Sequence, residues 1–179
     1  GMSASQGALP SVIWGEDTIR YMAEGHNAQK AINKVIKNDI EKDSRQISAI
    51  DINGNTGVFN GSKNLPEIHH IQKENFIASG NILSSKKVLE TMCETYFKTD
   101  ASVERKILEA LKRAYGTGGD KRGLMSAAIL ILSNDKPPLS LRIDYSKNPL
   151  DDLEGLINKC NQEEYKQWMK SLPNRKLIE

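Results

Sequence analysis

The sequence predicts an α+β fold in which layers of helices cover sheets of mainly antiparallel strands. Three observations predict it: an amphipathic helical pattern over residues 28–40, two strand-like runs within residues 46–59, and a continuous apolar run at residues 127–132. A run that is apolar at every position is typical of a strand covered on both faces, which requires a layer on each side of its sheet. No linker or repeat divides the chain, so we expect one domain over residues 3–172 and a short tail at 173–179.

Two helices are expected at the start of the chain. The first begins near Trp14 and ends at Gly25, and Asn27 is a suitable N-cap for the second. The apolar positions of the second helix recur at i, i+3, i+4, i+7 and i+8, so they share one face, and Ile40 extends that face by about one turn. These positions are Ala28, Ala31, Ile32, Val35 and Ile36.

The hydrophobic period then changes to that of strands. Residues 46–52 are rich in β-branched side chains, Asn53-Gly54 follows, and residues 56–59 resume the strand. Asn-Gly is the strongest short signal for a hairpin, because a type I′ turn needs positive φ at two positions. Residues 76–79 predict a third short strand.

The second half of the chain predicts helices, one hairpin and further helices. Pro137-Pro138 indicates the turn of an antiparallel pair, and Asn148-Pro149 is a good start for a helix. The expected elements are helices at 85–97 and 101–115, a glycine-rich loop at 116–123, strands at 127–132 and 139–143, a helix after Pro149, and a short helix that ends before Pro173.

Composition excludes several classes of protein. The chain has 25 Lys and Arg residues against 23 Asp and Glu, a net charge of +2, which argues against a domain that follows nucleic-acid phosphates. No apolar run approaches the about 18 residues that a membrane span needs. Cys93 and Cys160 are far apart and form no CxxC pair, so we expect two core residues rather than a zinc site or a disulfide. We therefore expect a cytoplasmic protein without nucleic-acid or membrane partners and without a cofactor.

Two short patterns resemble metal sites and are better explained otherwise. Asp51, Asn53 and Asn55 match the first ligands of an EF-hand loop, but the glycine and the bidentate Glu that should follow are missing, which favours a hairpin turn. His69 and His70 follow Glu67, yet neighbouring residues of an extended segment point to opposite faces. We expect no metal there, and a surface loop.

The glycine-rich loop at residues 116–123 fits neither of the common phosphate-binding motifs, because it follows a helix and Gly123 leads into a strand. Two interpretations of it stay open on spacing alone. The loop is a helix cap and turn, or its backbone N–H groups and Arg122 hold a carboxylate or an oxyanion.

The N-terminus offers a candidate nucleophile. Gly1 resembles the remnant of a tag ahead of an initiator Met, and removal of that Met would leave Ser3 as the first residue. A serine in this position can use its own α-amino group as a base, because the pKa of that group is ordinarily about 7.7–8.0.

Several segments, in their order along the chain, resemble the domain-of-unknown-function 1028 family. The resemblance spans about residues 4–157. The segments are Ser5-Gln6 with Trp14-Gly15, Arg45-Gln46-Ile47, Gly80-Asn81-Ile82-Leu83, Gly118-Gly119-Asp120-Lys121-Arg122-Gly123 with Ser126-Ala127-Ala128, Arg142-Ile143-Asp144, and the helix at Pro149. That family is grouped with the N-terminal-nucleophile (Ntn) hydrolase-like folds, so the resemblance implies a four-layer α-β-β-α sandwich.

The resemblance also implies a reaction and a site. The reaction is hydrolysis of an amide or peptide-like bond in a small-molecule or peptide-like substrate. Ser3 and Asn81 are the implied catalytic residues, with Asn81 donating to an oxyanion. Arg122 is implied to hold a substrate carboxylate or to orient Asp120. The implied substrate-binding residues are Ser5, Gly80, Gly119, Asp120 and Arg122.

Departures from the family pattern leave an alternative open. Family members usually begin two strands earlier, so we expect an N-terminally shortened sandwich whose open sheet edge is covered by self-association as a homodimer. Met125 and Tyr145-Ser146 stand where the family has polar groups able to do chemistry. The alternative function is therefore a catalytically inactive domain that binds a small molecule or another protein through the same cleft.

Overall fold

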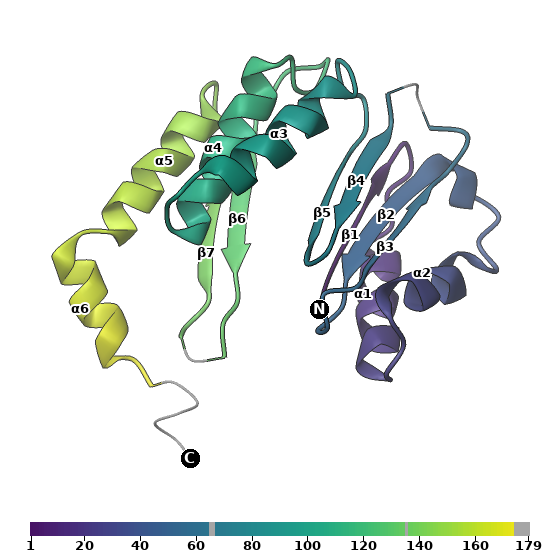
Figure 1. The fold of residues 1–179 in the computed structure, drawn as a ribbon, viewed down its shortest axis with the longest axis horizontal. Helices are drawn as coiled ribbons and strands as arrows, with labels where there is room; N and C mark the ends of the chain where they lie inside the picture. The colour runs from purple at the N-terminus through teal and green to yellow at the C-terminus, as the bar shows by residue number, and fades with distance from the viewer. Residues whose placement is uncertain (65–66, 135, 174–179) are drawn as a thin grey trace. The chain divides into compact units, whose positions relative to one another are not determined.

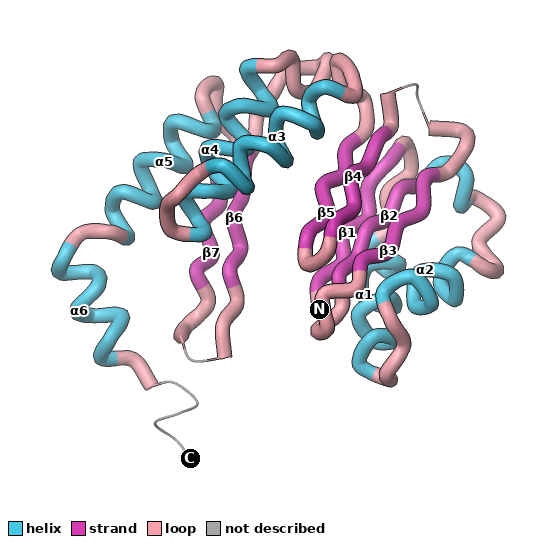
Figure 2. Tube along the Cα trace, viewed as in Figure 1, coloured by secondary structure: helices cyan, strands magenta, loops and turns pink. Residues whose placement is uncertain are grey.

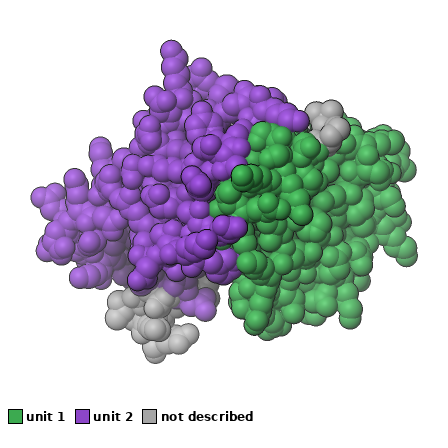
Figure 3. All heavy atoms as spheres, turned by 45° about the horizontal axis from the view of Figure 1, so that its top comes forward, with its two compact units in different colours: residues 1–93 green, residues 94–179 purple. Residues whose placement is uncertain are grey.

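A computed structural model describes residues 1–64, 67–134 and 136–173 as an α+β protein (Figures 1 and 2). These residues contain six α-helices and three small antiparallel sheets. The chain forms two compact units, unit 1 at residues 1–93 and unit 2 at residues 94–179 (Figure 3). A single domain over residues 3–172 stays a prediction, and the predicted tail lies outside the described residues except for Pro173.

Unit 1 contains two helices and five strands, and it holds the start of a third helix. Its elements are β1 (Met2–Gly7), α1 (Val12–Ala23), α2 (Ala28–Ile36), the short 3-10 helix Lys42–Ser44, β2 (Arg45–Ile50), β3 (Thr56–Asn60), β4 (His69–Lys73), β5 (Phe76–Gly80) and the first part of α3 (Lys87–Lys98). Strands β1, β2 and β3 form one antiparallel sheet in that order, and β4 pairs with β5 in a separate hairpin.

The two N-terminal helices cover one face of the three-stranded sheet (Figure 1). Both have side-chain N-caps: Ser11 accepts a hydrogen bond from the Trp14 N–H, and the predicted cap Asn27 accepts one from the Lys30 N–H at 2.9 Å. The helices bury an apolar core against the sheet. The core residues are Trp14, Ala28, Ile32, Ile47 and Ala49.

The predicted extension of α2 to Ile40 is wrong. The helix ends at Ile36, and the side chain of Ile40 is 90% exposed. The chain leaves the helical path because the carboxylate of Asp39 accepts hydrogen bonds from the Glu41 N–H and from Arg45, both beyond the helix. Local polar contacts of this kind compete with the helix for the same backbone.

The predicted hairpin of β2 and β3 is confirmed, but its predicted type I′ turn is wrong. Five residues, 51–55, connect the strands, and among them only Gly54 has a positive φ, at 81°. The Asp51 carboxylate accepts hydrogen bonds from the N–H groups of Asn53 and Asn55 at 2.9 and 3.0 Å, so it organises the loop itself. Asp51 is therefore part of the turn between the strands, as the sequence predicts.

Strand β4 was not expected, because its residues were interpreted as a surface loop. The β4–β5 hairpin lies over the face of the three-stranded sheet opposite α1 and α2, where β5 contacts β2 and β4 contacts β3 (Figure 1). Unit 1 therefore stacks helices, a sheet and a hairpin in that order.

Unit 2 packs helices against one face of a two-stranded sheet. Its elements are the end of α3, α4 (Val103–Gly116), β6 (Ala127–Ile131), β7 (Leu139–Ile143), α5 (Pro149–Cys160) and α6 (Glu163–Ser171). The predicted antiparallel pair is confirmed as β6 with β7. Helices and sheet share a core of Leu108, Ile129, Leu141, Leu153 and Ile157. Cys93 in unit 1 is buried as expected, and Cys160 in unit 2 is half-buried.

Within unit 2, residues 127–131 are covered on one face, and coverage of both faces stays a prediction. Ile129 is buried, whereas Leu130 and Leu132 are 48% and 60% exposed. Within unit 2 the core shared with the helices lies on one side of β6 and β7, so alternate side chains of β6 face away from it. None of the helices in the described part of the chain is long and apolar enough to cross a membrane.

Candidate functional site

Ser3 and Ser5 lie on the helix side of β1. Ser3 pairs with Ala49 and Ser5 with Ile47, and directly paired residues of antiparallel strands share a face of the sheet. Because Ile47 and Ala49 belong to the core beneath the helices, both serine side chains point toward that layer. The Ser3 hydroxyl is buried without a hydrogen-bond partner, and the Ser3 nitrogen is a peptide nitrogen within β1.

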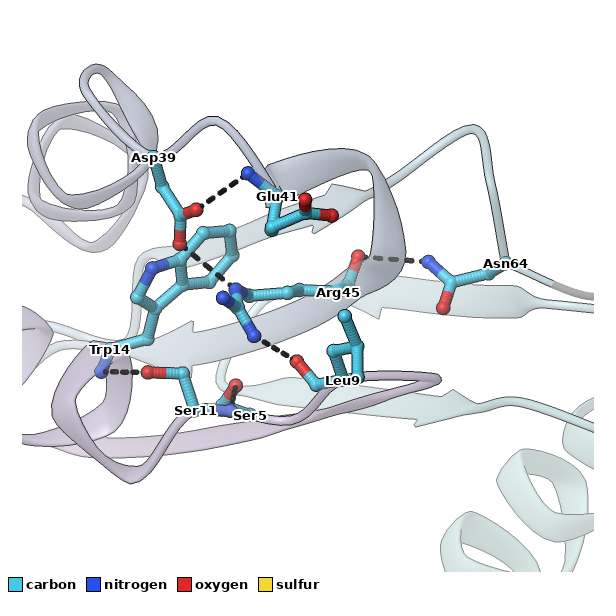
Figure 4. Close-up of polar contacts among 8 residues, drawn as sticks. All are labelled: Ser5, Leu9, Ser11, Trp14, Asp39, Glu41, Arg45 and Asn64. Atoms are coloured by element: carbon cyan, nitrogen blue, oxygen red, sulfur yellow. Dashed lines mark hydrogen bonds and ion pairs between the residues drawn. The ribbon is translucent and has the colours of Figure 1, made fainter.

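Ser5 belongs to a contact network that fixes the segment between β1 and α1 (Figure 4). Its hydroxyl accepts a hydrogen bond from the Ser11 N–H at 3.3 Å. Nearby, Arg45 donates to the Leu9 carbonyl and forms an ion pair with Asp39 at 2.9 Å, with its guanidinium 5.5 Å from the centre of the Trp14 ring. The role of Ser5 in this structure is thus to hold the chain in place.

The electrostatics of this network follow from the same contacts. Burial alone would raise the pKa of the Asp39 carboxyl, but hydrogen bonds from Arg45 and from the Glu41 N–H, together with the charge of Arg45, hold that pKa below its ordinary value. Asp39 is therefore ionised at neutral pH and unsuited to donate a proton.

Gly80 is the last residue of β5 and Asn81 follows it, in unit 1, on the other side of the three-stranded sheet from Ser3 and Ser5. The Gly80 carbonyl accepts a hydrogen bond from the buried Gln46 side chain at 3.5 Å. A Cβ at Gly80 would meet the side chain of Leu83 at 2.9 Å, so a glycine fits this close approach. Within unit 1, then, the structure does not bring the implied nucleophile and the implied oxyanion donor to one face of the sheet.

Gly119, Asp120 and Arg122 lie in unit 2, in the glycine-rich loop that follows α4. Arg122 donates to both oxygens of the Asp120 carboxylate at 3.0 and 2.7 Å. These hydrogen bonds, with the charge of Arg122, outweigh the effect of burial and lower the pKa of Asp120. Arg122 thus contacts Asp120 in this structure, and both roles implied for Arg122 stay predictions.

Most N–H groups of the glycine-rich loop donate within their own segment. Gly118 and Gly119 donate to carbonyls at the end of α4, at 2.9 and 3.1 Å, and Gly123 donates to the Asp120 carbonyl at 3.0 Å. The Arg122 N–H donates to the Asp120 carboxylate. This arrangement is that of a helix cap and turn, and it leaves few N–H groups for an anion.

A layer of mainly polar side chains, which also includes Val58 and Ile77, separates the three-stranded sheet of unit 1 from the β4–β5 hairpin. Three pairs join across it: Ser48 with Ser79 at 3.0 Å, Thr56 with Gln72 at 3.1 Å, and Asn60 with His70 at 3.0 Å. Packed sheets ordinarily meet through apolar side chains, so a hydrogen-bonded layer is unusual. We call these residues the polar layer: Gln46, Ser48, Thr56, Asn60, His70, Gln72 and Ser79.

The polar layer opens at one end into a depression of about 340 Å³. Two loops meet there, since the Asn75 N–H donates to the Gly54 carbonyl at 3.2 Å. The walls carry amide, hydroxyl and charged groups, so they suit a small polar molecule rather than an apolar one. The lining residues are Gly54, Asn55, Thr56, Gln72, Lys73 and Glu74.

Unit 2 contains a second cavity, of about 250 Å³, between the end of α4 and the start of α5. Lys112, Tyr115, Leu124 and Lys147 are among its lining residues. Gly119, Asp120 and Arg122 are not among them. The cavity therefore lies beside the glycine-rich loop without using its implied site residues.

The histidines of β4 differ in their surroundings. His69 Nε2 lies 2.8 Å from the Glu67 carboxylate, whereas His70 Nδ1 contacts the Asn60 amide on the opposite face of the strand. Burial, and next the proximity of His69, lower the pKa of His70. Within the described residues no three His, Cys, Asp or Glu side chains gather as a metal site would require.

Sequence reasoning missed the polar layer because its pattern resembles a solvent-exposed face. Gln46 and Ser48 alternate with Ile47 and Ala49, and such alternation ordinarily means one face in the core and one in water. Gln46 is instead 0% exposed. The residues of β4 carry no strand signal of their own, so the local pattern did not show what covers the polar face.

The fold and this site define an α+β protein whose N-terminal unit contains a layer of hydrogen-bonded polar side chains, which is buried at Gln46 and Ser48 and exposed at His70 and Gln72. The model of a family of unknown function, DUF1028, matches residues 1–153. The chain therefore belongs to the DUF1028 family, as the sequence resemblance implied.

One solved structure is similar to this chain over nearly its whole length. The crystal structure of protein SPO2555 from Silicibacter pomeroyi, also a DUF1028 protein, matches with a TM-score of 0.92 and 40% sequence identity. The match covers 99% of this chain and 76% of that one. No curated protein sequence matches.

Proposed function

We propose that this protein binds a small amide- or peptide-like molecule in the depression at the end of the polar layer, on a scaffold of the four-layer α-β-β-α Ntn-hydrolase-like type. The depression itself carries the proposal: it combines an open volume of about 340 Å³ with Asn55, Thr56 and Gln72 on its walls. Amide and hydroxyl groups both donate and accept hydrogen bonds, so they complement the C=O and N–H of an amide. Lys73 and Glu74 supply charges of both signs at its rim.

Binding without catalysis is favoured over hydrolysis by the position of Ser3. Its hydroxyl faces the helix layer, and the depression belongs to the β4–β5 side of the sheet. A nucleophile must lie within hydrogen-bond reach of a base and close to the bound substrate.

An NMR titration tests the proposal. Addition of N-acetyl amino-acid amides to the full chain should shift the side-chain amide signals of Asn55 and Gln72. Gln72→Ala should weaken binding several-fold, whereas Gln167→Ala, the same change at an exposed position of α6, should leave it unchanged. Shifts confined to residues 116–123 would instead place the ligand at the glycine-rich loop and contradict the proposal.

Hydrolysis of an amide or peptide-like bond is the second candidate, favoured by the buried Ser3 hydroxyl that has no hydrogen-bond partner. Removal of Gly1 and Met2 exposes the Ser3 α-amino group. If Ser3 is the nucleophile, the shortened chain reacts with a serine-directed electrophile and cleaves acyl-amino-acid amides, and Ser3→Ala abolishes both. Ser62→Ala, the same change at an exposed turn of unit 1, is the matched control, and absence of labelling and turnover rejects the candidate.

Two further expectations accompany both candidates as proposals: a cytoplasmic location and self-association as a homodimer. The exposed apolar side chains Leu130 and Leu132 on and after β6 give the dimer a surface to bury. Light scattering decides this, and a monomer at working concentration contradicts it.

A further inference from the structure

Three side-chain amides form a continuous chain of hydrogen bonds that ends at His70. Gln6 donates to the Gln46 side-chain oxygen, and Gln46 Nε2 donates to Asn60 Oδ1 at 2.9 Å. Asn60 Nδ2 then lies 3.0 Å from His70 Nδ1. We call Gln6, Gln46 and Asn60 the amide chain; it crosses the three strands of the sheet and reaches the hairpin.

Backbone carbonyls fix the direction of this chain. Gln46 Nε2 also lies 3.2 Å from the His69 carbonyl oxygen and 3.5 Å from that of Gly80. A carbonyl oxygen can only accept, so the atom of Gln46 on this side must be the nitrogen. Its partner on Asn60 must then be the oxygen, which turns the Asn60 NH2 group toward His70.

The consequence for His70 is a single neutral tautomer. An NH2 group only donates, so His70 Nδ1 must accept and carries no proton. In a neutral imidazole the proton then resides on Nε2. Protonation of Nδ1 would set two donors against each other, 3.0 Å apart.

The surroundings of His70 agree with a neutral ring. Burial, and next the charge of His69, lower the pKa of His70. The facing strand β3 presents Asn60 and the paired position on β5 presents Ser79, neither of which carries a charge. The carboxylate of Glu67 lies with His69, on the other face of β4.

We propose that the amide chain holds His70 as a neutral hydrogen-bond donor, through Nε2–H, for a carbonyl or carboxylate oxygen of a small ligand. Gln6, Gln46 and Asn60 are positioning residues in this assignment. A ring with its proton on Nε2 and its Nδ1 occupied is neither a general base nor a metal ligand. The ligand class rests on the proposed function, whereas the tautomer does not.

The tautomer of His70 can be measured directly in the protein without ligand. Long-range ¹H–¹⁵N correlation spectra at neutral pH should give an unprotonated Nδ1 and a protonated Nε2 for His70. Asn60→Asp keeps an acceptor for Gln46 and places a carboxylate oxygen against Nδ1, so it should move the proton to Nδ1 and raise the pKa of His70. Asn33→Asp, an exposed change on α2, should do neither.

Acetate and N-acetylglycine amide then probe the donor. Either should shift the His70 Nε2–H signal in a saturable way, and His70→Gln, which retains an N–H donor, should keep more affinity than His70→Phe. A proton on Nδ1 in the wild-type protein overturns the assigned tautomer, and an unperturbed Nε2–H signal overturns the donor role. Shifts at Gln72 report separately on the depression, so failure there rejects the proposed function without touching His70.

Discussion

Both units place helices against one face of a sheet, but they treat the other face differently. In unit 1 the face opposite the helices carries Gln46 and Ser48, and a hairpin covers it through hydrogen bonds. In unit 2 the corresponding face of β6 carries Leu130, which is 48% exposed. In unit 1 the polar side chains of Gln46 and Ser48 are buried, whereas in unit 2 the apolar side chain of Leu130 is half-exposed, the reverse of the usual arrangement.

This difference suits the sheet face opposite the helices to a different role in each unit. Hydrogen bonds across the polar layer are directional, so they fix the register of the hairpin against the sheet and orient single side chains such as His70. An apolar face has no such preference of direction and suits association with another surface. We therefore assign ligand recognition to unit 1 and self-association to unit 2 within the proposals above.

The largest expected effect comes from the unit 2 core. Leu153 is 0% exposed between α5 and the sheet, so Leu153→Ala should reduce the free energy of unfolding by about 2–5 kcal/mol. Leu130→Ala, the same change on the open face, should stay within about 0.5 kcal/mol. Urea unfolding followed by circular dichroism measures both. A comparable loss for Leu130→Ala would mean that this face is covered in solution, and repetition over a range of protein concentrations would detect the second copy.

The next effect tests whether the polar layer holds unit 1 together. Gln46→Leu leaves the Asn60 side-chain oxygen and the His69 carbonyl without their donor, which should cost about 1–3 kcal/mol of unfolding free energy. Gln72 is exposed and makes one hydrogen bond across the layer, so Gln72→Leu should change the free energy of unfolding by no more than about 0.5 kcal/mol. Fluorescence of Trp14 reports on this unit, with Trp168 replaced by Phe in every variant. Equal losses would show that burial of Gln46 adds nothing to the layer.

The smallest effect concerns the contact between the two loops of unit 1. A Cβ at Gly54 would lie 1.7 Å from Asn75 Oδ1, at a φ of +81°. Gly54→Ala should lower the free energy of unfolding by at least the about 1–2 kcal/mol that a left-handed residue costs. Gly25→Ala is the matched control, because Gly25 has a φ of +93° and open space around it.

The excess loss for Gly54→Ala over Gly25→Ala measures the close contact alone. Asn75→Gly removes the obstructing side chain at a residue whose own φ is +57°, so the double variant should recover stability in the same urea experiment. Identical losses at the two glycines, with no recovery, would show that the loops do not depend on each other.

Local patterns accounted for most elements of the fold. Periodicity and capping residues identified α1 and α2, and Asn27 caps its helix as expected. The hairpin of β2 and β3 was recognisable too, yet the carboxylate of Asp51 replaced the expected tight turn with a five-residue loop. Strand β4 was not predicted, because His69 and His70 carry no β-strand signal of their own. The strand forms through its pairing with β5.

The candidate site was predictable only in part. The glycine-rich loop forms a helix cap and turn, which was one of two interpretations open on spacing alone; the binding role that the family resemblance implied for it stays a prediction. The polar layer was not anticipated, because Gln46 and Asn60 are distant in sequence from the carbonyl and imidazole groups that satisfy them. Contacts of this range depend on how strands stack, which a linear pattern does not specify.

The sequence by itself determined the class of fold and the family, because helix periods, caps and hairpin turns are local and a shared motif order survives at 40% identity. Only the tertiary structure decided which alternating face is buried. Alternation gives two faces to every strand but does not say what covers each. Stacking of the β4–β5 hairpin on the polar face of β2 provides hydrogen-bond partners for the buried Gln46 and Ser48 side chains of unit 1, whereas in unit 2 the Leu130 side chain on β6 is 48% exposed.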